Sequence, residues 1–123
     1  TFDNIDVHSN QLGLLKASKC FTQSNMTCNS CHSSHENERG NTKLFSQRCM
    51  NCHKPEHDNF CKMAPNLGAS ITSNCIDCHM PSQRSRAITL DLPGSEVPVA
   101  AFVRSHFISV YPDEVRKFLN EKK

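Results

Sequence analysis

Three copies of the pentad C-x-x-C-H lie within this chain of 123 residues, and no other feature limits its fold as strongly. Each copy has two cysteines three positions apart and a histidine directly after the second, at residues 28–32, 49–53 and 75–79. This is the attachment signature of c-type haem, in which two thiols add to the vinyl groups of one porphyrin and the histidine becomes the proximal iron ligand. The pattern therefore predicts three covalently attached haem c groups. Their expected thioether residues are Cys28, Cys31, Cys49, Cys52, Cys75 and Cys78, and their expected proximal ligands are His32, His53 and His79.

Disulfide bonds and zinc are the alternative uses of these cysteines. Eight cysteines can pair in roughly a hundred ways, but a disulfide framework gives no reason for a histidine after each pair. Zinc sites usually combine two such pairs, and three pairs leave one over. A thioredoxin-like redox motif would need a βαβ context, which the polar flanking residues do not suggest. Covalent haem is favoured, and the metal and disulfide alternatives stay open.

The two cysteines outside the pentads are Cys20 and Cys61. Haem of the c type is attached in an oxidising compartment, where a remaining pair of cysteines favours a disulfide. We therefore expect a Cys20–Cys61 bridge between the segment before the first pentad and the segment after the second. Two buried thiols are the alternative.

Composition indicates that the polypeptide alone cannot supply a large core. Only 37% of the residues are apolar, cysteines included, and the mean hydropathy is −0.54. A chain of this kind needs an external source of stability, and three porphyrins would provide it. We expect a mainly α fold with extensive irregular loops, in which the haems form the core of a single domain over residues 1–123. No apolar run is long enough to span a membrane.

Local patterns predict a few elements outside the pentads, and each pentad is expected to form a helical turn. A helix is expected over residues 9–20, and a second is expected to open at Pro112 with acidic residues in its first turn. Alternating residues from Arg86 to Leu92 predict a short strand that ends at Pro93-Gly94. Residues 97–110 are the most apolar stretch. Polar residues predict loops at 36–43 and 64–70.

Four histidines lie outside the pentads, namely His8, His35, His57 and His106. They are enough to give all three haems a second histidine ligand. His35 follows His32 by three residues, so we expect it to serve a different haem and to bring two haems close together. His57 lies in a polar segment, residues 54–58, where a solvated role is the simpler interpretation. His106 lies within the apolar stretch, where a ligand role is favoured once haems are present.

Net charge gives no evidence for a nucleic-acid partner. The formal charge is +2, and three ferric bis-histidine haems with ionised propionates would bring it to about −1. The arginines are spread along the chain, with no basic run and no interleaved aromatic residues. No phosphate-binding glycine loop, Ser/His/Asp arrangement or paired carboxylates stand out.

Beyond the individual pentads, the order of motifs resembles that of a known family. The pentad at 28–32 continues as C-x-x-C-H-x-x-H to His35, the third pentad continues with Met80-Pro81, and Arg104-Ser105-His106 follows. This order resembles multihaem cytochromes c of the 554 type, which are related to the nitrite reductase and hydroxylamine oxidoreductase group. The resemblance runs from about His8 to Pro112. It implies that His8, His35 and His106 are distal ligands and leaves His57 as a further candidate.

Electron transfer by closely spaced, mostly bis-histidine low-spin haems is the function that these patterns favour. The resemblance implies a periplasmic or extracellular protein that exchanges electrons with redox partner proteins. No signal peptide is present in the sequence, as expected of a mature chain. One alternative is a haem enzyme that acts on nitrite, hydroxylamine or peroxide at an open haem. Another is a subunit of an extended multihaem wire, in which the fourth histidine ligates a haem of a neighbouring chain.

Overall fold

Two compact units make up the chain in the computed structural model, which describes residues 11–121 except for the side chains of residues 85–87. The first unit comprises Thr1–Asn25 and Met80–Ser109, and we call it the hairpin unit. The second comprises Met26–His79 and Val110–Lys123, and we call it the pentad unit because all three C-x-x-C-H segments lie in it. The single domain over residues 1–123 stays a prediction.

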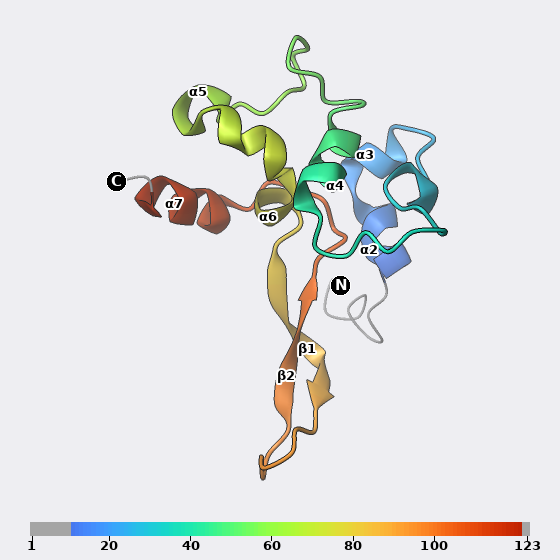
Figure 1. The fold of residues 1–123 in the computed structure, drawn as a ribbon, viewed down its shortest axis with the longest axis vertical. Helices are drawn as coiled ribbons and strands as arrows, with labels where there is room; N and C mark the ends of the chain where they lie inside the picture. Colours follow the sequence, from blue (N-terminus) through green and yellow to red (C-terminus); the bar gives the residue numbers. More distant parts are fainter. Residues whose placement is uncertain (1–10, 122–123) are drawn as a thin grey trace. The chain divides into compact units, whose positions relative to one another are not determined.

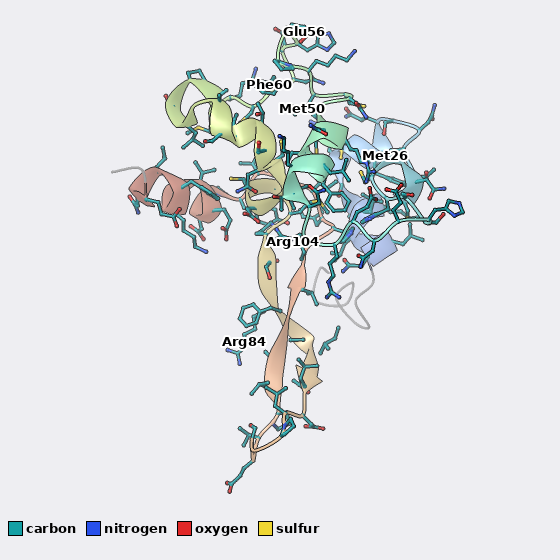
Figure 2. All side chains as sticks on the ribbon, in the orientation of Figure 1. Met26, Met50, Glu56, Phe60, Arg84 and Arg104 are labelled. Atoms are coloured by element: carbon teal, nitrogen blue, oxygen red, sulfur yellow. The ribbon has the colours of Figure 1, made fainter. Side chains whose placement is uncertain are left out.

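Two short helices and one β-hairpin form the described part of the hairpin unit (Figure 1). The helices are α2, Gln11–Ala17, and α3, Lys19–Thr22. The strands are β1, Ser82–Leu90, and β2, Val99–Arg104, which pair antiparallel with a register irregularity between Arg84 and Thr89. Figure 2 shows Arg84 on the hairpin, where its side chain is exposed.

The predicted strand at 86–92 is confirmed in type but begins earlier, at Ser82. Its first residues do not alternate in hydropathy, and pairing with β2 extends it, with Ser82 opposite Arg104. Pro98 directly precedes β2, as expected because proline has no N–H to give to the ladder. Two further hydrogen bonds hold the base of the hairpin, from Ser105 N to Pro81 O at 3.0 Å and from Arg104 Nη1 to Met80 O at 2.9 Å.

The helix predicted over residues 9–20 is interrupted at Ser18, which has an extended backbone and is fully buried. Its hydroxyl accepts a hydrogen bond from Ile108 N at 2.8 Å. The hydroxyl proton can go to Leu14 O at 3.2 Å or to His106 O at 3.1 Å. Ser18 thus joins α2 to the segment that carries His106, which is the reason why one continuous helix does not form.

Six short helices account for the regular structure of the pentad unit in its described residues (Figure 1). In chain order they are η1, Cys28–Ser30; α4, Thr42–Cys49; α5, Ala64–Leu67; η2, Ala69–Ser73; α6, Cys75–His79; and α7, Pro112–Glu121. Three of them, η1, α4 and α6, contain pentad residues, and η2 ends just before the third pentad. The longest is α7, which confirms the terminal helix predicted to open at Pro112.

The loop predicted over residues 64–70 is wrong, because α5 and the start of η2 lie there. The loop predicted over residues 36–43 is confirmed for 36–41, but residues 42 and 43 belong to helix α4. This helix begins at Thr42 because Asn41 caps it, with the side chain of Asn41 accepting from Leu44 N at 3.1 Å. Asparagine is among the residues that most often cap helices in this way. Gly40, at φ 81°, turns the chain immediately before the cap. None of the helices within residues 11–121 has the length and apolar composition needed to cross a membrane.

Replacing Ser18 by alanine should lower the free energy of unfolding by about 1–3 kcal/mol, because Ile108 N, which is part-buried, would lose its acceptor. Urea denaturation of the purified protein measures the change. Ser82→Ala is the matched control, since Ser82 is exposed at the start of β1. Equal unfolding midpoints for the two variants would contradict the role given to Ser18.

Candidate haem-binding site

The three pentads fold into the same kind of helical turn. In the first, His32 N donates to Cys28 O at 2.9 Å, and in the second His53 N donates to Cys49 O, also at 2.9 Å. The third pentad is helix α6, Cys75–His79. Residues at positions i, i+3 and i+4 of a helical turn share one face. Each turn therefore presents both of its thiols and its imidazole on the same side, as attachment to one porphyrin requires.

The side chains of these turns are accessible, and few apolar side chains pack around them. Cys28 and Cys52 are exposed, and the other four pentad cysteines are half-buried. Among the described residues of the pentad unit, Ile76 is the only buried apolar side chain. A flat apolar group bound to the thiols would cover surface that the polypeptide leaves open. The donor set and its surroundings therefore fit haem.

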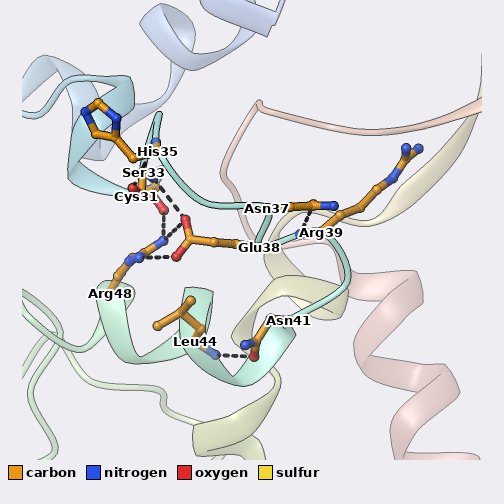
Figure 3. Close-up of polar contacts among 9 residues, drawn as sticks. All are labelled: Cys31, Ser33, His35, Asn37, Glu38, Arg39, Asn41, Leu44 and Arg48. Atoms are coloured by element: carbon orange, nitrogen blue, oxygen red, sulfur yellow. Dashed lines mark hydrogen bonds and ion pairs between the residues drawn. The ribbon is translucent and has the colours of Figure 1, made fainter.

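An ion pair links the first turn to helix α4 (Figure 3). The guanidinium of Arg48 meets the carboxylate of Glu38 with both ends, Nη1 to Oε1 at 2.9 Å and Nη2 to Oε2 at 2.5 Å. Arg48 Nη1 also donates to Cys31 O at 2.5 Å. Ser33 N donates to Glu38 Oε1 at 2.9 Å. The end of the first turn is thus bound to both members of the pair.

This environment lowers the pKa of the Glu38 carboxyl from 4.5 to about 2. The hydrogen bonds from Arg48 contribute most, followed by the backbone N–H of Ser33, and the charges of Arg48 and His32 act in the same direction. The pKa of Arg48 rises in return, chiefly through its hydrogen bonds to Glu38. The Glu38 side chain is only 7% exposed, so water screens the pair less than it would a surface pair.

Phe45 extends the same set of contacts to the imidazole of His32 in the first turn. The edge of one ring meets the face of the other, with 5.2 Å between the centroids of His32 and Phe45. The guanidinium carbon of Arg48 lies 5.6 Å from the Phe45 centroid, a cation–π arrangement. The His32 ring is therefore held against α4 while remaining exposed.

Ser46 links helix α4 to the third turn. It is fully buried, and its Oγ accepts a hydrogen bond from Cys75 N at 2.9 Å. Interaction with the Cys49 and Ser46 side chains lowers the pKa of the Cys75 thiol to about 6, although burial opposes the shift.

Cys78 lies in the same third turn, but its environment raises the pKa of its thiol. Burial is the largest cause of the raised pKa, and electrostatic interaction with Cys61, Asp77 and Glu114 adds to it. The two thiols of one turn thus differ in acidity.

Asn59 joins the loop after the second pentad to that pentad by two contacts. Its backbone carbonyl oxygen lies 2.6 Å from Nδ1 of His53, and its side-chain Nδ2 donates to Cys52 O at 3.1 Å. A carbonyl can only accept, so Nδ1 of His53 carries the proton and Nε2 is the nitrogen that would bind iron. Metal-binding histidines are commonly oriented by such a bond from the other ring nitrogen.

The candidate distal histidines lie in different places. His35 and His57 are exposed in loops of the pentad unit, and the N–H of His35 donates to Ser33 Oγ at 3.3 Å. His106 is half-buried in the hairpin unit, where its Nδ1 lies 3.3 Å from Arg104 O. His8 lies outside the described residues. Within residues 11–121, no three His, Cys, Asp or Glu side chains are grouped to hold a metal ion. Distal ligation stays a prediction.

Cys20 and Cys61 lie in different units. Cys20 is on α3 of the hairpin unit, Cys61 follows the second pentad in the pentad unit, and both are half-buried. Their expected disulfide stays a prediction.

Five residues with clear roles around the turns were missed in the sequence, namely Glu38, Phe45, Ser46, Arg48 and Asn59. One signal was present: Gly40 and Asn41 are a plausible start for a helix that leads into the second pentad. A helix predicted from that start would have included Phe45, Ser46 and Arg48. Glu38 and Asn59 carry no such signal, because they act from irregular loops.

Comparison of the chain with protein-family models, with curated proteins and with solved structures gave no match. Function is therefore inferred from the chain's own residues.

Because Glu38 is ion-paired with Arg48, we expect the stability of the fold to fall at acid pH. A carboxyl whose pKa is lowered on folding contributes stability that is complete above its ordinary pKa of 4.5 and is lost as the pH falls to about 2. Glu38→Gln removes the charge, so its loss of stability over this window should be smaller than that of the wild type. Urea unfolding midpoints at several pH values measure the difference.

Glu36→Gln is the control for that measurement, because Glu36 is an exposed carboxylate in the same loop. It should follow the wild-type profile. Parallel profiles for the wild type and Glu38→Gln would show that the Arg48 pair does not stabilise the fold.

Proposed function

We propose that this chain is a trihaem c-type cytochrome whose function is electron transfer. The observation that carries the proposal is the repeated turn: three pentads each present two thiols and one imidazole on one face. All three belong to one unit, whose described residues bury a single apolar side chain. Bound haem would supply one-electron redox chemistry at its iron and a large apolar surface.

The chain's own residues would hold and orient that group. The six pentad cysteines would form the thioethers, and His32, His53 and His79 would be the proximal ligands. The carbonyl of Asn59 keeps the proton on Nδ1 of His53, which directs Nε2 to the metal and increases its basicity. His8, His35 and His106 are the proposed distal ligands, with His57 as a further candidate.

Location and partners follow from the same chemistry. Covalent haem attachment and a Cys20–Cys61 disulfide both belong to an oxidising compartment, so we place the protein in the periplasm or outside the cell. Its partners would be redox proteins, further multihaem subunits or copies of the same chain. Ligation by two histidines favours low potentials relative to His/Met ligation.

Haem number is the first test. The intact mass of the purified protein should equal the chain plus three haems, and the pyridine haemochrome spectrum should give the same stoichiometry. Changing both cysteines of one pentad to serine, for example Cys49→Ser with Cys52→Ser, should remove one haem. The matched control is Cys20→Ser with Cys61→Ser, which should keep all three. A wild-type mass equal to the bare chain would exclude the proposal.

Spin state tests the distal ligands. Ferric protein should be low-spin at every haem, and His35→Ala or His106→Ala should each open one haem to carbon monoxide in the ferrous state. His57→Ala serves as the comparison and should leave the spectrum unchanged. Carbon monoxide or nitrite binding by the wild type would instead indicate an open haem and favour the enzymatic alternative.

A further inference from the structure

Helix α4 lies at the centre of the contacts among the three turns. Its last residue, Cys49, is also the first residue of the second pentad, so the helix and the second turn are continuous. Arg48 contacts the first turn and Ser46 contacts the third. Helix α4 is thus connected to all three turns, to the second by the chain itself and to the first and third by side-chain hydrogen bonds.

Ser46 and Arg48 reach different sides of the helix. Each residue advances an α-helix by roughly 100°, so two side chains separated by two positions point in nearly opposite directions. Helix α4 therefore places one polar contact toward the first turn and another toward the third. The two contacts bridge long stretches of sequence, 17 residues for Arg48 to Cys31 and 29 for Ser46 to Cys75.

Both contacts are hydrogen bonds to backbone groups of the turns. The N–H of the first residue of a helix has no acceptor within the helix. For helix α6, the hydroxyl of Ser46 is that acceptor for Cys75 N, and it comes from another helix. Cys31 O, at the end of the first turn, accepts from Arg48 Nη1. Loss of the Ser46 hydroxyl would leave Cys75 N, a part-buried backbone group, without this acceptor.

Arginine is required for the first contact by geometry as well as charge. Its planar group meets the Glu38 carboxylate with two nitrogens and reaches Cys31 O with one of them. A lysine ammonium is a point charge on a flexible stem and cannot reproduce that fork. Arg48→Lys therefore tests the geometry while keeping the charge.

We propose that Ser46 and Arg48 are positioning residues through which helix α4 holds the first and third attachment turns at fixed places relative to the second. This inference rests on the proposed function, because the groups so placed are the haems. Electronic coupling between redox groups falls steeply with their separation. A device that fixes the turns therefore governs how well neighbouring haems interact, without touching either iron.

The test uses Ser46→Ala and Arg48→Lys in the full chain, first checked by intact mass for three haems. In both variants the exciton couplet in the Soret circular dichroism, which reports the mutual placement of haems, should lose amplitude, and the midpoint potentials should shift. Ser46→Thr keeps the hydroxyl and should restore the couplet. Exposed residues supply the matched controls, Ser70→Ala in η2 and Arg39→Lys in the loop before α4, and both should match the wild type.

Amide exchange at Cys75 gives a second measurement that does not depend on the haems. Ser46→Ala should speed it by about tenfold, because one hydrogen bond is lost. Three bound haems with an unchanged couplet and unchanged potentials in both variants would overturn the positioning role and leave the proposed function intact. A wild-type chain without haem would overturn the proposed function itself.

Discussion

A unit that buries one apolar side chain among its described residues must be ordered by other forces. In the pentad unit, polar contacts do this work on the polypeptide side: Arg48 with Glu38 and Cys31, and Ser46 with Cys75. Hydrogen bonds of this kind contribute modestly to stability, about 1 kcal/mol each, but they fix direction. The hydrophobic contribution that such a small unit lacks is what three porphyrins would add. The small apolar core and the three pentad turns therefore have one explanation, in which haems bound at the turns would complete the core.

Polar contacts also explain how a chain with such short helices holds side chains in defined orientations. The Asn59 carbonyl sets the tautomer of His53, and Phe45 places the ring of His32 against α4. In the hairpin unit, the buried hydroxyl of Ser18 joins α2 to the backbone of His106 and Ile108. In each case a side chain contacts a backbone group or ring outside its own turn. Orientations fixed in this way involve few residues, so the loss of any one of these contacts would have a large local effect.

Several elements were predictable because their signals are local. The terminal helix follows from Pro112 and the acidic residues after it, and the hairpin strand from alternation before Pro93-Gly94. The same is true of the helical turns, since two cysteines and a histidine at i, i+3 and i+4 share a face only on a helix. The break at Ser18 and the start of β1 at Ser82 were not predictable, because partners from distant segments determine both.

The sequence by itself determined which thiols and imidazoles share a turn, and how many such sets there are. That information lies within five consecutive residues, where helical periodicity alone brings the groups onto one face. Only the tertiary structure decided how the sets are related, through Ser46 and Arg48 on helix α4. Their partners lie 29 and 17 residues away, and which residues meet across such distances depends on the path of the whole chain.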